Sequence, residues 1–276
     1  MVRAAAAASL ILAVFAAGCA AVPVPPTLPS QVPELWAGAG YLIGYLPRKA
    51  LPDSLALLPL PPADGSAAAA ADLDAYRSAR ALKGSPRWAA AADDSVLTFP
   101  QAAGAFACAL DLAVSQEATP HLNMLLRRSL ADAALATDAA KVAYKRTRPF
   151  ARFGEGSCTP GDEAMLAKDG SYPSGHAALG WAWALVLSEI SPERANDLLA
   201  RGQVFAQSRV VCGVHWQSDV DAGKVIGAAT VARLHADPVF TAQIEAAKRE
   251  VLDARARGAT ASGDCAAQAR VLGVGR

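Results

Sequence analysis

The sequence lacks most features that would assign it to a common functional class. Its 276 residues carry a formal net charge of only +1, so no broad basic surface for nucleic acid is expected. Beyond the N-terminus, no uncharged apolar run reaches the roughly 20 residues that a membrane-spanning helix needs. A nucleotide-binding glycine fingerprint, a paired CxxC zinc motif and an internal repeat are all absent. Any anion-binding site must therefore be local.

The N-terminus has the pattern of an export signal. Arg3 precedes the apolar stretch AAAAASLILAVFAAG, whose length is typical of a signal peptide rather than a membrane span. The stretch ends in AAGCA, which resembles the lipobox of bacterial lipoproteins, although Ala16 stands where Leu is more usual. We predict a signal peptide at 1–21 and a periplasmic or secreted protein. Cleavage before Cys19 would leave a lipid-anchored lipoprotein, whereas cleavage near Ala21 would release a soluble one.

Cysteine is scarce, with five residues in the chain. Setting Cys19 aside leaves an even number in a protein predicted for an oxidising compartment: Cys108, Cys158, Cys212 and Cys265. Two disulfides can form, and the sequence does not choose among the three connectivities. The alternative is that Cys108 and Cys212, which lie in apolar contexts, are buried free thiols.

Alternating strand-like runs are scarce, whereas helical periodicity is common. Apolar residues recur at helical spacing in segments such as 122–144, 176–187 and 240–252. Ser85-Pro86 and Ser191-Pro192 each place a cap residue before a first-turn proline, as helix starts do. Residues 22–36 are proline-rich and typical of an extended spacer. With 53% hydrophobic residues overall, we predict an all-α protein with a single helical-bundle domain at 37–276.

The stretch GSYPSGHA, residues 170–177, directly precedes a long apolar helix. At a helix start, Ser174, Gly175 and His176 would present a hydroxyl, backbone N–H groups and an imidazole to one point, which suits an anion. The alternative is that Ser174 only caps the helix and that His176 is a surface residue of its first turn.

A basic segment, KVAYKRTRPF, occupies residues 141–150. Lys141 and Arg148 are seven residues apart, so both can point from one face of the same helix. Pro149 favours a break in the helix immediately beyond Arg148. Lys145 and Arg146 are predicted to lie on a solvated basic face. The alternative, if this segment is taken alone, is that all of its cations lie on a solvated basic face.

The third segment is SRVVCGVHWQSDVDAG, residues 208–223. His215 and Asp219 are four apart, and on a helix the carboxylate can accept from one imidazole nitrogen and leave the other nucleophilic. Arg209 cannot share their face of one continuous helix, but Gly213 offers a turn that would let it approach from the preceding helix. The alternative is a chance His and Asp on a polar face.

Together, the three segments resemble the tripartite signature of the phosphatidic acid phosphatase type 2 (PAP2) superfamily, which also contains the vanadium haloperoxidases. The matching positions are Lys141 with six residues to Arg148-Pro149, then Pro173-Ser174-Gly175-His176, then Ser208-Arg209 with five residues to His215 and three to Asp219. The longer forms GSYPSGH and SRVVCGVHWQSDVDA are similar to the bacterial class A non-specific acid phosphatases, and SLALLPLPPADGS resembles that group's N-terminal region.

This resemblance implies a metal-independent acid phosphatase that needs no cofactor and hydrolyses soluble phosphate monoesters through a phosphohistidine. It implies that His215 is the nucleophile, that Asp219 orients it, and that His176 protonates the leaving oxygen. The implied phosphate-binding residues are Lys141, Arg148, Ser174, Gly175 and Arg209. Three cations, a hydroxyl and backbone N–H groups can stabilise a phosphoryl group without metal. Transfer to other alcohols and a homo-oligomeric assembly are further implications, and neither the natural ester nor the oligomeric state follows from the sequence.

Three other functions compete with this one. A vanadium haloperoxidase could hold vanadate in the same pocket, but the chain length and the class A motifs argue against it. A membrane lipid phosphatase conflicts with the lack of spanning helices. A phosphate-binding or lipoprotein-anchored module without turnover would not need both histidines and Asp219.

The remaining histidines and three of the tryptophans are assigned to helix ends and packing: His121, His235, Trp181, Trp183 and Trp216. Ala177 departs from the Thr that class A members often carry after the histidine.

Overall fold

The computed structural model describes residues 24–274, so the predicted signal peptide and Cys19 lie outside the described residues. Within this range the regular structure is helical, and Glu34 and Leu42 form an isolated β-bridge. The predicted all-α fold is confirmed. The α-helices are α1 Ser54–Leu57, α2 Ala67–Arg80, α3 Pro86–Asp93, α4 Ala107–Leu110, α5 Pro120–Leu135, α6 Asp138–Tyr144, α7 Pro149–Phe153, α8 Glu163–Leu166, α9 Gly175–Ile190, α10 Ala195–Val211, α11 Gln217–Leu234, α12 Pro238–Ala256 and α13 Cys265–Leu272.

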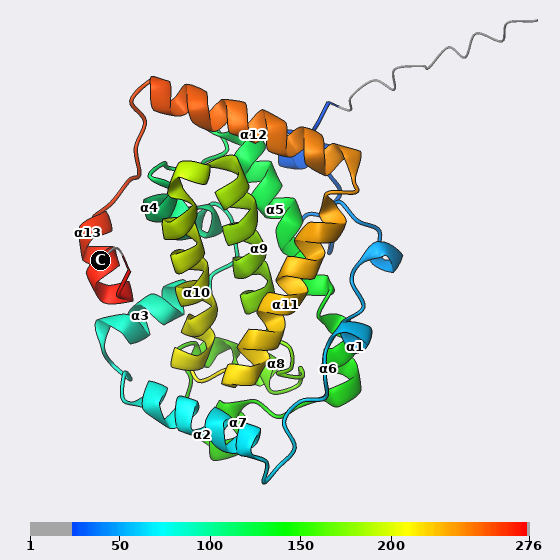
Figure 1. Cartoon of the computed structure of the whole chain (residues 1–276), viewed down its shortest axis with the longest axis vertical. Helices are drawn as coiled ribbons and strands as arrows, with labels where there is room; N and C mark the ends of the chain where they lie inside the picture. The colour runs from blue at the N-terminus through cyan, green and yellow to red at the C-terminus, as the bar shows by residue number, and fades with distance from the viewer. Residues whose placement is uncertain (1–23, 275–276) are drawn as a thin grey trace, which may run out of the picture.

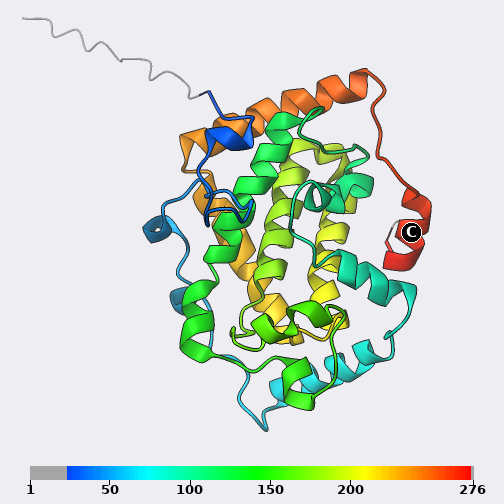
Figure 2. The same cartoon turned by 180° about the vertical axis from the view of Figure 1, so that it is seen from behind.

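Helix α9 is the centre of the bundle. It lies between α10 and α11 and packs also against α5, while α12 crosses one end of the bundle and α2 and α7 lie near the other (Figures 1 and 2). Trp183 on α9 is fully buried, and its indole N–H donates to the Leu126 carbonyl oxygen at 3.1 Å. The prediction that Trp183 is a packing residue is therefore confirmed. A helix that is apolar on nearly all sides belongs in such a central position.

Small residues let the neighbouring helices approach α9 closely. A Cβ atom at Gly180 would overlap the Phe205 ring of α10, and one at Gly227 of α11 would overlap the Ala178 carbonyl. One turn earlier on α11, a Cβ at Gly223 would overlap the Ser174 carbonyl oxygen. These contacts bring the start of α11 against the start of α9, where the sequence motifs lie.

The predicted helix starts are present. Ser85 caps α3 by accepting from the Trp88 N–H, with Pro86 in the first turn. Ser191-Pro192 begins a 3-10 turn, Pro192–Arg194, that leads into α10. The N-terminal segment packs earlier than expected, since Val32 is buried against Leu42 and Met124. The packed region thus extends into the 22–36 range predicted as a spacer, because an apolar side chain among the prolines finds a place beside α5.

The four cysteines of the described chain form two disulfides, Cys108–Cys265 and Cys158–Cys212. The alternative of buried free thiols is therefore wrong. The first disulfide joins α13 to α4. The second joins the segment before α8 to the end of α10, and the Cys158 N–H also donates to the Cys212 carbonyl at 3.1 Å. This second link holds the segment around 158 beside the third sequence motif.

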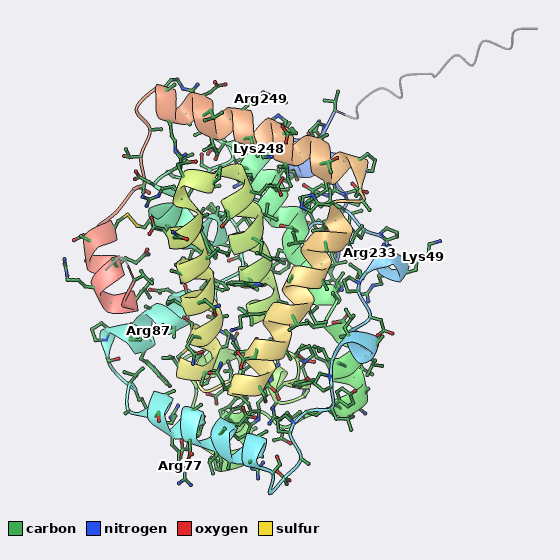
Figure 3. The ribbon with its side chains drawn as sticks, in the orientation of Figure 1. Lys49, Arg77, Arg87, Arg233, Lys248 and Arg249 are labelled. Carbon is green, nitrogen blue, oxygen red and sulfur yellow. A yellow bond between two sulfur atoms is a disulfide. The ribbon has the colours of Figure 1, made fainter. Side chains whose placement is uncertain are left out.

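The described residues contain no membrane-spanning helix, and the basic residues labelled in Figure 3 come from several elements. None of the helices in residues 24–274 is both long enough and apolar enough to cross a bilayer. Figure 3 shows the labelled Lys49, Arg77, Arg233 and Arg249 around the periphery of the molecule on different elements. The cations that do gather are buried, and they lie at the end of the bundle opposite α12.

Candidate active site

The three sequence motifs meet where α9 begins, α10 ends and α11 begins, at the end of the bundle opposite α12 (Figure 1). Ser174 caps α9 by accepting from the Ala177 N–H at 3.2 Å, and it is fully buried. Its own N–H donates to the Asp219 carbonyl oxygen at 2.9 Å. The predicted helix start is confirmed, and this backbone hydrogen bond joins the motif at 170–177 to the motif at 208–223.

His215 does not lie on a helix. It precedes Trp216, the N-cap of α11, and Asp219 stands in the first turn. The prediction that both residues share one helix is therefore wrong. They still meet, because the Asp219 carboxylate folds back over the helix start: Oδ2 accepts from the Trp216 N–H at 2.8 Å and lies 3.4 Å from His215 Nδ1. The local reason is that a first-turn carboxylate satisfies the free N–H groups of a helix start.

The hydrogen bonds of His215 select its tautomer. Nε2 lies 2.9 Å from Arg148 Nη1, and a guanidinium can only donate, so Nε2 is the acceptor and the proton is assigned to Nδ1. Nδ1 has no hydrogen bond of good geometry, and the contact with Asp219 is an electrostatic one at 3.4 Å. His215 is only 2% exposed, and burial followed by Arg148 lowers its pKa well below the usual value. A neutral imidazole with an unprotonated Nε2 is a nucleophile once Arg148 no longer donates to that nitrogen.

Asp219 is held by Arg146, which the sequence placed on a solvated face. That prediction is wrong: the Arg146 side chain is 14% exposed and donates to Asp219 Oδ1 at 2.6 Å. It also donates to Asp72 of α2 at 2.7 Å, and Ser218 donates to the same Asp72 through its N–H and its hydroxyl. The physical reason is that Asp219 is fully buried, and a buried carboxylate needs a cation partner. Burial raises the pKa of Asp219, and Arg146 opposes that rise.

Lys141 and Arg148 come together, although they do not share a helix. Helix α6 ends at Tyr144, because Lys145 adopts a left-handed conformation with φ +43°, and Arg148 is the N-cap of α7. The prediction of one continuous helix is wrong. Both cations nevertheless donate to the Asp169 carboxylate, Lys141 Nζ at 3.1 Å and Arg148 Nη2 at 3.0 Å. Burial, followed by the nearby Arg148 charge, lowers the pKa of Lys141 to about 8.

Arg209 is a buried cation with unpaired hydrogen-bond donors. Its side chain is 2% exposed, and its Nε and Nη1 have no hydrogen-bond partner within residues 24–274. Burial and the Arg148 charge lower its pKa to about 9. The turn predicted at Gly213 is present, with φ +79°, and the Val214 and His215 N–H groups both donate to the Arg209 carbonyl. Donors left unpaired in the interior cost free energy, so Arg209 faces a place suited to an anion.

His176 is partly buried at the start of α9, and its ring is hydrogen-bonded to the protein rather than free on an exposed surface. Its Nε2 lies 3.0 Å from the Ser95 carbonyl oxygen, which can only accept, so Nε2 carries a proton and Nδ1 is left for a second one. Burial and Arg209 lower the pKa of His176 well below its usual value. Ser95 follows Asp94, whose buried carboxylate accepts from Arg201 of α10 and from Ser208 at 2.5 Å.

Sequence reasoning missed four contributors to this site. Asp72, Asp94 and Asp169 stand in segments with no pattern that separates them from other acidic residues, and the Ser95 contact uses a backbone carbonyl, which no residue type signals. The predicted site residues lie at the same end of the bundle. Within the described residues, no group of three or more His, Cys, Asp or Glu side chains is placed to hold a metal ion.

Comparison with known proteins identifies the family. A PAP2 superfamily model matches residues 122–240, the range that holds all three motifs. A non-specific acid phosphatase of Providencia stuartii is 43% identical over 248 residues, which cover 87% of this chain and 96% of that protein. A non-specific acid phosphatase of Salmonella typhimurium is 45% identical over 197 residues, 71% of this chain and 79% of that protein. An acid phosphatase of Zymomonas mobilis is 41% identical over 203 residues, 74% of this chain and 77% of that protein. The chain therefore belongs to the PAP2 superfamily, among the bacterial non-specific acid phosphatases.

Proposed function

We propose that this protein is an acid phosphatase that hydrolyses soluble phosphate monoesters through a phosphohistidine on His215, without a metal. The names of its relatives support the activity. The main structural support for an anion site is that Arg209, a buried guanidinium, has unpaired donors and lies near both histidines.

The phosphate of the ester binds among the cations at the start of α9. Arg209 donates from Nε and Nη1, while Lys141 of α6 and Arg148 at the start of α7 add positive charge. The backbone N–H groups of Gly175 and His176 belong to the free first turn of a 16-residue helix, where an anion is stabilised by unpaired donors and the helix dipole. Phosphoryl transfer needs mainly this positioning and charge stabilisation.

His215 Nε2 then attacks phosphorus. The N–P bond forms as the P–O bond to the leaving group breaks, and His176 Nδ1 gives its proton to the leaving oxygen. Before attack, Arg148 Nη1 turns from Nε2 to a phosphoryl oxygen. The Nδ1–H of His215 points toward Asp219, so the carboxylate stabilises the positive charge that develops on the ring.

In the second half-reaction a water attacks the phosphohistidine. His176 takes a proton from the water, the N–P bond breaks, and inorganic phosphate leaves with His215 neutral again. An alcohol in place of water would complete a phosphotransfer. Because burial and Arg209 lower the pKa of His176, protonation depends on the bound ester, whose negative charge raises the pKa of both histidines.

Rapid-quench trapping tests this mechanism. His215→Ala should form no covalent phosphoenzyme with any ester. His176→Ala should still form an acid-labile one with p-nitrophenyl phosphate, whose leaving group needs little protonation, but should lose about 100-fold to 10,000-fold with alkyl phosphates. Turnover should survive a chelator, and vanadate should inhibit it. A phosphoenzyme in His215→Ala, or complete loss on chelation with restoration by a divalent ion, would contradict the proposal.

We further propose that the protein acts outside the cytoplasm, in the periplasm or after secretion. Two disulfides in one chain support an oxidising compartment. Mass spectrometry of the native protein should show either an acylated Cys19 or a new N-terminus a few residues later. An intact Met1 form in the cytoplasm would contradict both arrangements.

A further inference from the structure

Asp169 lies at the point where two of the proposed phosphate-binding cations meet. Its Oδ2 accepts from Lys141 Nζ at 3.1 Å and from Arg148 Nη2 at 3.0 Å. The two cations are almost entirely buried, whereas the Asp169 side chain is 46% exposed. It stands in the loop between α8 and α9, just before the GSYPSGH stretch. One exposed carboxylate therefore pairs with two buried cations and offsets only part of their charge.

The positions of the two cations do not depend on this carboxylate. Lys141 Nζ also donates to the Gly170 carbonyl at 2.6 Å. Arg148 donates from Nε to the Leu166 carbonyl at 2.8 Å and from Nη1 to the Val214 carbonyl at 3.1 Å. Neutral backbone carbonyls thus hold both side chains in place. The Asp169 carboxylate adds a negative charge beside the two cations that an incoming phosphate would contact.

Arg209, across the same site, provides the contrast. Its Nε and Nη1 are unpaired, so an anion reaches it without displacing any protein group. An anion that binds Lys141 and Arg148 must compete with Asp169. Because half of the Asp169 side chain already faces solvent, the carboxylate can turn outward into water at small desolvation cost.

From these contacts we propose that Asp169 is a built-in competitor of phosphate, which weakens binding of the substrate and product anions and speeds release of the product. The inference rests on the proposed function, and it concerns affinity for the anion rather than the chemical step. The carboxylate turns outward when the ester binds, and it returns to Lys141 and Arg148 as inorganic phosphate leaves.

Asp169→Asn tests this role, because the amide keeps the shape and an acceptor oxygen and removes only the charge. The dissociation constant for inorganic phosphate should fall about fivefold, the size that a partly exposed ion pair supplies. The KM for p-nitrophenyl phosphate should fall by a similar factor, and inhibition by product should strengthen. Asp169→Ala should change phosphate binding in the same direction.

Asp162→Asn is the matched control. Asp162 is exposed just before α8, whereas Asp169 follows that helix, and Asp162 acts on Arg209 through its charge rather than through a bond to Lys141 or Arg148. Its replacement should change phosphate binding less than twofold. Titration calorimetry with inorganic phosphate and the purified protein measures all variants without turnover. If wild type binds phosphate but does not hydrolyse p-nitrophenyl phosphate, the proposed function fails while the comparison of variants still stands.

Three results would overturn the inference. Weaker phosphate binding by Asp169→Asn would make the carboxylate a positioning group for the cations. An unchanged constant, or an equal shift in Asp162→Asn, would leave Asp169 with no specific role beyond the general field. Absence of phosphate binding in wild type and in the variants would remove the anion site on which the competition depends.

Discussion

Two buried arginines within this end of the bundle have opposite surroundings. Arg146 donates to Asp72, Ser218 and Asp219 and belongs to a closed network. Arg209, buried more deeply, leaves Nε and Nη1 without partners in the part of the chain that the structure describes. A buried cation surrounded by carboxylates supports the structure, whereas one with unpaired donors is suited to a ligand. The difference predicts that the two residues respond in opposite ways to the same substitution.

The largest effect is expected for Arg146→Met. Loss of the guanidinium leaves Asp72 and Asp219 buried without a cation, which should lower the free energy of unfolding by about 3–5 kcal/mol. Denaturant unfolding measures this change. Asp72→Asn in the same chain should recover part of the loss, since it removes one of the two unpaired charges. Additive losses in the double variant would show that the two residues do not form one network.

Arg209→Met should reverse that pattern. Activity toward p-nitrophenyl phosphate should fall about 100-fold to 1,000-fold, the typical result of removing one donor to a transition-state anion. The free energy of unfolding should rise by about 1 kcal/mol, because a buried guanidinium with unpaired donors is replaced by an apolar side chain. Inorganic phosphate should raise the melting temperature of wild type but not of the variant. A marked loss of stability would mean that Arg209 has structural partners.

A smaller effect concerns pH and Lys141, whose pKa is lowered to about 8 by burial and by Arg148. The folded protein without ligand loses this proton as pH rises through about 8, while the unfolded chain keeps it to higher pH. Bound phosphate favours the charged form, so phosphate affinity should fall as pH rises above 8. Calorimetric titration from pH 6 to about 10 measures this fall. Lys141→Arg, which stays charged, should flatten the profile, and an equal fall in that variant would assign the titration to another group.

The smallest effect is expected at Lys145, the sequence neighbour of Arg146. Lys145 is exposed, and its backbone ends α6 in a left-handed conformation. Lys145→Asn should change activity less than twofold and stability by less than about 0.5 kcal/mol, because Asn tolerates that conformation and no site contact is lost. Parallel unfolding measurements on Arg146→Met would sharpen the comparison, since two adjacent cations of one motif should then differ by several kcal/mol in their effect on stability, about 3–5 against less than about 0.5.

Local sequence signals determined much of this protein. The Ser174 cap, the glycine turn at Gly213 and the helical periodicity depend on residues within one or two turns, so they follow from short-range geometry. The spacing of the three motifs also identified the residues that come together at the end of the bundle. Where the sequence prediction was wrong, as for the shared helix of Lys141 and Arg148, the spacing was compatible with a helix that a left-handed residue ends early.

Only the tertiary structure decided which partners the charged groups take. Arg146 meets Asp72 across 74 residues and Asp219 across 73, and Asp169 meets Lys141 across 28. The pairing of the four cysteines is of the same kind, with separations of 157 and 54 residues. No local pattern specifies such pairs, because the free energy of a buried charge depends on which side chains packing brings within hydrogen-bond distance. For the same reason, the sequence placed Arg146 on a solvated face, and only the packed bundle showed that Arg146 belongs to a network with Asp72 and Asp219, whereas Arg209 keeps two donors without a partner among the described residues.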